Sequence, residues 1–140
     1  MINLTPEEYK KLQGTESAKT GSKSSAKRRA RSKYRNKWVT GENGVRFQSK
    51  MEAARYSELL VLEQAGDISQ LELQPRFELQ PKFTYQGKTI RAITYSADFG
   101  YIENGKHVIE DVKGVETQVF KVKWKMVKYL NPDIDFRVVK

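Results

Sequence analysis

Two carboxylates and a lysine in the second half of the chain have the types and spacing of a metal site. Asn104-Gly105 is the strongest short signal for a two-residue type I′ turn, so the strands on either side of it are expected to pair as a hairpin. Counting back from that turn along both strands places Asp98 opposite Asp111. Side chains alternate along a strand, and Lys113 therefore shares the face of Asp111.

Opposed carboxylates need a compensating cation. Residues directly across a sheet have Cβ atoms roughly 4.5–5.5 Å apart, where two like charges destabilise the pairing. Hard carboxylate oxygens suit Mg²⁺ or Mn²⁺, which usually keep several waters and take phosphate oxygens. The pattern therefore predicts a site for Mg²⁺ or Mn²⁺ at Asp98 and Asp111, with Lys113 beside it.

Other interpretations of the same residues stay open. An Asp-x-Lys on an edge strand is also typical of a solvated face without chemistry. A register shifted by one residue would put Glu110 in the place of Asp111, because Glu110 otherwise points to the opposite face. The aromatic residues around Asp98 are expected to pack in the core rather than to stack on bases: Tyr95, Phe99 and Tyr101.

The elements that would position this hairpin follow from periodicity and turn signals. Thr5 and Pro6 begin a short helix within residues 3–13, and further helices are expected from Ser49 to about Gln64 and over residues 117–130. Extended runs are expected at residues 44–47, 68–73, 77–85, 89–101, 106–113 and 136–139, with the first hairpin strand at 97–103. This order predicts an α/β or α+β domain with a mixed central sheet flanked by helices.

Glu52 has a structural explanation of its own. Ser49-Lys50-Met51-Glu52 is a capping box, in which the glutamate closes the first turn of the helix. This explanation needs no catalysis, but it does not prevent a second role for the carboxylate.

The chain's positive charge is concentrated in one segment. Its 140 residues carry a net charge of +9, and residues 18–41 contain no acid. Removing the nine bases of this segment from the 26 Lys and Arg residues leaves 17, which equals the 17 Asp and Glu residues. We expect a flexible arm that binds nucleic acid without sequence specificity. Its bases are Lys19, Lys23, Lys27, Arg28, Arg29, Arg31, Lys33, Arg35 and Lys37.

Composition excludes several other classes of site. Without Cys there is no disulfide framework, thiolate zinc site or thiol nucleophile, which suits a reducing cytoplasm. The single His107 cannot form a multi-histidine metal centre. No apolar run approaches the ~18 residues of a membrane span, and we expect no membrane partner.

Asp98, followed after a hairpin by Asp111-Val112-Lys113, resembles the Asp…(Asp/Glu)-x-Lys signature of the PD-(D/E)XK nuclease superfamily, with Ala97-Asp98 in place of its Pro-Asp. The strings FQSKMEAARY, LELQPRFEL, ITYSADFGY and VIEDVKGVET resemble one phage- and prophage-encoded branch, a domain of unknown function. That branch is similar to transposase endonuclease subunits and Holliday junction resolvases. The resemblance covers residues 38–140 and implies a restriction-endonuclease-like core, preceded by the helix and basic arm of residues 1–37.

The resemblance also implies an activity, which is Mg²⁺- or Mn²⁺-dependent hydrolysis of DNA phosphodiester bonds. Asp98, Asp111 and the backbone carbonyl of Val112 would ligate the metal, and Glu52 would bind the metal or one of its waters. Lys113 would orient the attacking water or stabilise developing charge. Further residues would contact DNA: Gln118, Lys121 and Lys125 on the last helix, and Lys27, Arg28, Arg29, Arg31, Lys33, Arg35 and Lys37 in the arm.

We therefore expect a DNA endonuclease of phage recombination or DNA processing, in the cytoplasm of a bacterial host. Branched DNA is the favoured substrate, and symmetric cutting of two strands would require a homodimer. Other phage replication or recombination proteins are further candidate partners. The alternatives are a non-catalytic nucleic-acid-binding accessory protein that retains the nuclease fold, and an RNA- or ribosome-binding basic protein. For Lys121, Lys125 and Lys128, a solvated helix face also remains open.

Overall fold

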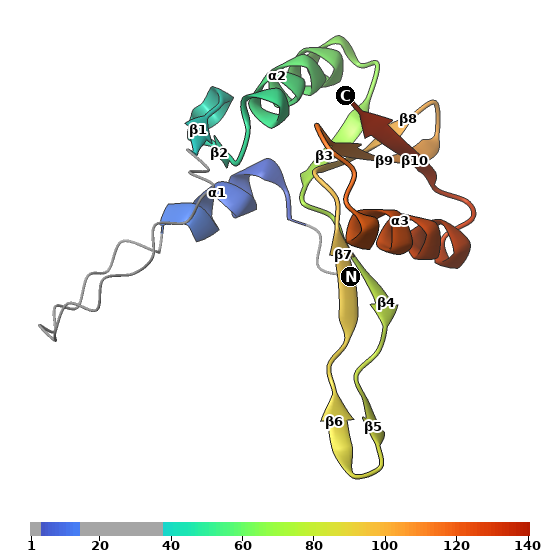
Figure 1. Cartoon of the computed structure of the whole chain (residues 1–140). Coiled ribbons are helices and arrows are strands. Elements are labelled where there is room, and N and C mark those ends of the chain that lie inside the picture. Colours follow the sequence, from blue (N-terminus) through green and yellow to red (C-terminus); the bar gives the residue numbers. More distant parts are fainter. Residues whose placement is uncertain (1–3, 15–37) are drawn as a thin grey trace, which may run out of the picture.

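In the computed structural model, a four-stranded sheet lies between two helices (Figure 1). The structure describes residues 4–14 and 38–140. The helices are α1 (Pro6–Gly14), η2 (Glu42–Gly44, a 3₁₀ turn), α2 (Lys50–Ala65) and α3 (Gln118–Leu130). The strands are β1 (Val39–Thr40), β2 (Arg46–Phe47), β3 (Ser69–Leu73), β4 (Arg76–Gln80), β5 (Phe83–Tyr85), β6 (Lys88–Ile90), β7 (Ile93–Ser96), β8 (Phe99–Glu103), β9 (Lys106–Val112) and β10 (Asp135–Val139).

The central sheet has the strand order β10-β9-β8-β3 and is mixed. β8 and β9 are antiparallel, with Glu103 paired to Lys106 and Phe99 to Glu110, which confirms the predicted register. Asn104 and Gly105 both have positive φ (51° and 74°), as a type I′ turn requires. β10 returns after α3 and pairs with β9 in parallel.

The helix signals in the sequence are confirmed. Ser49 caps α2 by accepting the backbone N–H of Glu52 at 3.1 Å, and Gly66 ends the helix with φ 80° in the left-handed region. Thr117 caps α3 in the same way as Ser49. α1 begins at Pro6, after Thr5, rather than at the start of the expected range.

Each face of the sheet has its own apolar core. Towards α2, side chains of β3, β8 and β9 bury Tyr56 and Leu59 completely. Towards α3, Ile109 of β9 packs with Trp124 and with aromatic residues of β4, β7 and β10. Successive residues of β9 therefore face different layers, and this alternation separates the functional side chains described below.

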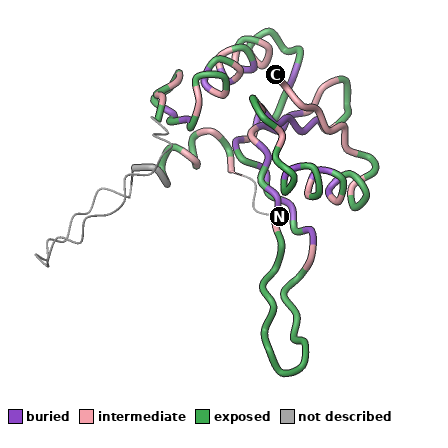
Figure 2. Tube along the Cα trace, viewed as in Figure 1, coloured by how far each residue is buried: buried purple, intermediate pink, exposed green. Residues whose placement is uncertain are grey.

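Two narrow ribbons extend beyond the sheet. β4 pairs with β7 and β5 pairs with β6, each as a separate two-stranded sheet. The expected single runs over 77–85 and 89–101 are therefore interrupted, the first at Pro81-Lys82 between β4 and β5. Proline has no N–H for a ladder, which explains that break. The β5–β6 hairpin points away from the body of the molecule and is exposed along its length (Figures 1 and 2).

The architecture is mixed α+β, which confirms the predicted fold class. Tyr95, Phe99 and Tyr101 are buried, as expected for core residues. Among the helices of the described residues, none is both long enough and apolar enough to span a lipid bilayer.

Candidate active site

Asp98 lies in a bend between β7 and β8, at one end of the central sheet. Its backbone N–H donates at 3.1 Å to the carbonyl of Glu110, which is the ladder partner of Phe99, so Asp98 lies just past the end of the regular ladder and out of its register. Its side-chain Oδ2 accepts the backbone N–H of Val112 at 2.7 Å. The carboxylate of the first strand is thus fixed directly to the strand that carries the second.

Asp111 is almost fully buried, at 1% exposure. The hydroxyl of Tyr95 donates to its Oδ2, and the ammonium of Lys113 lies 3.0 Å from its Oδ1. That ion pair lacks the geometry of a hydrogen bond, so among the described residues Oδ1 has no hydrogen-bond partner. A buried carboxylate oxygen that accepts no hydrogen bond has the capacity to bind a further partner.

The two aspartates repel each other. Burial and, second to it, the negative charge of Asp111 raise the pKa of Asp98 to about 8. The N–H of Val112 opposes this shift, and the charge of Glu52 adds to it. Burial and the charge of Asp111 also raise the pKa of Tyr95, which keeps its phenolic proton available for donation. The site therefore holds more negative charge than its own donors neutralise.

Glu52 approaches the pair from the opposite layer, at the N-terminus of α2. Its backbone N–H completes the predicted cap at Ser49, and its carboxylate accepts the N–H of Gln48 at 3.4 Å. Burial raises the pKa of Glu52, Lys113 lowers it and Asp111 raises it, so Glu52 lies within the electrostatic field of the site. In residues 4–14 and 38–140, however, no three His, Asp or Glu side chains are grouped closely enough to hold a metal together.

A pocket opens beside these acids. Glu52 and Asp98 both line it, together with Trp38 and Arg46. Trp38 is about half exposed (49%), and the guanidinium of Arg46 lies 5.1 Å from the centroid of its ring. Tyr9 of α1 also lines this pocket. A cation and an aromatic ring therefore adjoin the acids on the side that faces solvent.

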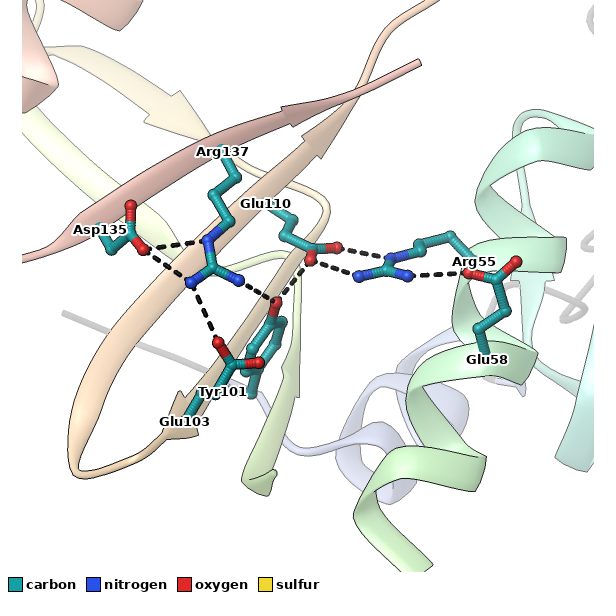
Figure 3. A network of polar contacts seen from close by, with 7 residues as sticks. All are labelled: Arg55, Glu58, Tyr101, Glu103, Glu110, Asp135 and Arg137. Carbon is teal, nitrogen blue, oxygen red and sulfur yellow. Dashed lines mark hydrogen bonds and ion pairs between the residues drawn. The ribbon is translucent and has the colours of Figure 1, made fainter. Parts of the chain in front are cut away.

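Glu110, the alternative to Asp111 in a slipped register, lies on the other face. Arg55 of α2 donates to both of its carboxylate oxygens, at 2.9 and 2.6 Å, and the hydroxyl of Tyr101 donates to one of them (Figure 3). Arg137 links Tyr101 to two further acids, one at the end of β8 and one at the start of β10. The slipped register is wrong, and Glu110 is a neutralised structural acid.

The DNA-binding candidates are distributed unevenly. Three of them are exposed on α3, which begins five residues after Lys113: Gln118, Lys121 and Lys125. The ammonium of Lys113 lies 4.9 Å from the ring centroid of Phe120, which places the start of α3 beside the site. The remaining candidates lie outside the described residues: Lys27, Arg28, Arg29, Arg31, Lys33, Arg35 and Lys37.

Two kinds of residue were missed by the sequence reasoning. Tyr95 was assigned to the core, where it does pack, but it also donates to Asp111. The only signal for this second role was its position three residues before Asp98 on the strand leading to it. Trp38 and Arg46 were not singled out at all, because their approach to Asp98 depends on how residues 38–47 pack against β3 and α2.

The comparisons with known proteins identify a family and give no function. No curated protein and no solved structure matches the chain significantly. A family model described as "Protein of unknown function (DUF1064)" matches residues 31–140. The match includes the whole β8–β9 hairpin, both flanking helices and every acid of the candidate site. By this match, which spans well over half of its length, the chain belongs to the DUF1064 family.

Proposed function

We propose that this protein is a metal-dependent DNA endonuclease with a PD-(D/E)XK-type core. The observation that carries the proposal is a pair of carboxylates: Asp111, which is buried on β9, and Asp98, which is partly buried in the bend before β8, with the ammonium of Lys113 3.0 Å from Asp111. Two carboxylates held close together away from water cost stability, so a fold that retains them has a use for them. The Asp…Asp-x-Lys order along a hairpin is the pattern that the nuclease resemblance requires.

A divalent cation fits the donor set. Within residues 4–14 and 38–140, one oxygen of Asp111 accepts no hydrogen bond, and burial together with the charge of Asp111 raises the pKa of Asp98. Mg²⁺ is commonly held by only one or two carboxylates, with waters and substrate phosphate oxygens completing its shell. Asp98 and Asp111, with the carbonyl of Val112, would hold it here. When bound, the ion would supply positive charge for the scissile phosphate and a water of lowered pKa.

The other side chains have distinct tasks in this mechanism. Lys113 is placed to orient the attacking water or to stabilise charge that develops on the phosphate, because its ammonium already lies against Asp111. Glu52 acts through water rather than as a direct ligand, since its carboxylate is engaged with the N–H of Gln48. Tyr95 fixes the orientation of Asp111 by its hydrogen bond.

Affinity for DNA is assigned to the basic segment and to the exposed residues of α3. Tyr9 of α1 precedes the first base of this segment, and Trp38 directly follows the last. Both residues line the same pocket as Asp98. The nine bases between them are therefore joined to the fold beside the acids. We propose branched DNA as the substrate, a homodimer for paired cuts, and a role in phage recombination in the bacterial cytoplasm.

The test is cleavage of labelled duplex, nicked, forked and four-way DNA, with Mg²⁺ or with EDTA. The parent should cleave at least one of these substrates only with the metal. Asp111→Asn should lower the rate by about a thousandfold or more, because it removes a ligand charge from the site. Asp133→Asn, the same substitution at an exposed aspartate outside the site, should cleave like the parent.

If the parent cleaves nothing with Mg²⁺ or Mn²⁺, the endonuclease proposal is wrong. DNA binding without cleavage, unchanged in Asp111→Asn, would instead support the alternative of a non-catalytic accessory protein. Preferential binding of RNA would support the third alternative, which explains the basic segment and leaves the buried aspartates without a role.

A further inference from the structure

The β5–β6 hairpin is exposed along both of its strands. All six of its strand residues are exposed, and Figure 2 shows the tube exposed throughout this hairpin. Gln86 and Gly87 form its turn, both with positive φ (47° and 74°), as in a type I′ turn. A two-stranded ribbon on its own is marginally stable in water. An exposed and well-formed ribbon therefore indicates a surface that serves an interaction.

The two faces of this hairpin differ in chemistry. Phe83 pairs with Ile90 and Tyr85 with Lys88, and because side chains alternate these four share one face. Two aromatic rings, an isoleucine and a lysine therefore lie together. Phe83 is 42% exposed and Tyr85 60%. The other face carries only the cross-strand pair Thr84 and Thr89.

Charge decides what kind of partner fits. Residues 79–97 contain Lys82, Lys88 and Arg91 and no acid. A second copy of the chain, docked hairpin to hairpin about a two-fold axis, would set these cations against their equivalents. Nucleic acid offers phosphates to the cations and apolar base and sugar surface to the rings. The charge pattern therefore favours a nucleic-acid partner over self-association.

The hairpin is joined directly to the candidate site. β7 ends at Ser96, two residues before Asp98, so the ribbon leads from the tip to the acids. Strands rise about 3.3 Å per residue, so the eleven steps from Gly87 to Asp98 span up to about 36 Å. This equals about one turn of B-DNA, whose major groove admits a two-stranded ribbon.

We propose that the β5–β6 hairpin is a second DNA contact that lies in the groove of the duplex flanking the cleaved phosphate. Its Phe83–Tyr85–Lys88–Ile90 face meets the DNA, up to about one helical turn from Asp98. This inference rests on the proposed function, because it places the same DNA on the hairpin and at the acids. The hairpin supplies affinity and orientation, and no chemistry.

The test measures binding by fluorescence anisotropy in EDTA, on a labelled duplex of about 24 base pairs and on one of about 8, too short to reach both places. Phe83→Ala/Tyr85→Ala should bind the long duplex about tenfold more weakly and the short one like the parent. Lys88→Ala should lower the slope of log K against log salt by about one. Thr84→Ala/Thr89→Ala, on the opposite face, is the matched control and should stay within about twofold of the parent on both.

A shortened chain tests the hairpin as a whole. Gln80 and Ile93 are paired in the β4–β7 ribbon, so replacing residues 81–92 by Asn-Gly closes that ribbon with a two-residue turn. This variant should keep the parent's melting temperature, because the removed side chains are exposed. It should bind the long duplex no more tightly than the short one.

Equal binding of the long duplex by the parent and by Phe83→Ala/Tyr85→Ala would overturn the inference. So would a change from dimer to monomer in that variant by sedimentation velocity, which would make the face a self-association surface. Because binding is measured without metal, these outcomes are independent of cleavage. If the parent cleaves DNA normally and the hairpin variants bind the long duplex as tightly as the parent, only this inference is refuted. If neither the parent nor any variant cleaves DNA but the hairpin variants bind the long duplex more weakly, only the proposed function is refuted.

Discussion

Two neighbouring acids of β9 are equally buried but differ in their hydrogen-bond and ion-pair partners. Glu110 and Asp111 are each 1% exposed. Glu110, on the α2 face, receives two hydrogen bonds from Arg55 and one from Tyr101. Asp111, on the α3 face, has one hydrogen bond from Tyr95, an ion pair with Lys113 and a second aspartate close by.

The difference separates an acid whose charge is paired within the fold from the acid to which we assign a function in our proposal. A buried carboxylate that the fold neutralises completely contributes to the arrangement of the layers, because its partners come from elements far apart in sequence. A buried carboxylate that accepts one hydrogen bond and has a repelling neighbour is in a state that a further cation would stabilise. Burial does not distinguish Glu110 from Asp111; the face of β9 on which each lies and the partners it meets there do.

Removing the partner of Glu110 should have the largest effect on stability. Arg55→Ala leaves a buried carboxylate with only Tyr101, and we expect the free energy of unfolding to fall by about 3 kcal/mol. Urea denaturation of the parent and the variant measures it. The double variant Arg55→Ala/Glu110→Gln should recover part of the loss, because it also removes the uncompensated charge.

A loss below about 0.5 kcal/mol in Arg55→Ala would contradict the structural role of this pair. Equal losses in the single and double variants would show that packing of the Arg55 side chain, and not charge compensation, explains the effect.

Removing the negative charge of Asp98 should raise the free energy of unfolding, whereas removing Arg55 should lower it. Burial and Asp111 raise the folded-state pKa of Asp98 to about 8, above the ~3.9 of an unfolded aspartate. The folded state therefore binds the carboxyl proton of Asp98 more tightly than the unfolded state does. The stability that this protonation contributes is fully present below about pH 4 and is lost as pH rises towards 8. Asp98→Asn avoids this loss, and in EDTA we expect it to exceed the parent's stability at pH 8 by on the order of 2 kcal/mol.

Thermal melts between pH 5 and pH 8.5 measure this difference, which should widen as pH rises. Excess Mg²⁺ should stabilise the parent and leave Asp98→Asn unchanged, since ligand that binds only the folded state adds stability. A difference that does not vary with pH would contradict repulsion between Asp98 and Asp111 as its cause.

Glu52 should show the smallest change in stability. Gln at this position preserves the capping acceptor for the N–H of Gln48, so Glu52→Gln should alter the free energy of unfolding by less than about 0.5 kcal/mol. Its Mg²⁺ affinity, measured by isothermal titration calorimetry, should fall by about 10-fold, as for a residue that acts through a bound water. Unchanged affinity would leave Glu52 with only its helix-capping role.

The parts of this comparison that depend on neighbouring residues were predictable from sequence. Asn104-Gly105 fixes the register of β8 and β9, and alternation then separates Glu110 from Asp111. The capping box at Ser49 and Glu52 and the end of α2 at Gly66 are equally local. Local signals of this kind were sufficient for the α+β class and for the faces of β9.

The rest depends on tertiary packing. Arg55 and Glu110 are 55 residues apart, and no pattern in the sequence pairs them. Asp98 turned out to lie in a bend, where its carboxylate bonds to the N–H of Val112, because the strand changes partner between β7 and β8.

The parallel pairing of β9 with β10 gives the site a folding order. Glu103 and Lys106 meet across two residues, so the β8–β9 hairpin closes on the microsecond scale of local structure. Val112 and Val139 meet across 26 residues that include α3, and this closure is slower because its loop entropy is larger. The N–H of Lys113 is bonded to the carbonyl of Val139 at 2.9 Å. We therefore expect the two aspartates to be brought together early in folding, and Lys113 to be fixed only when the crossover is complete.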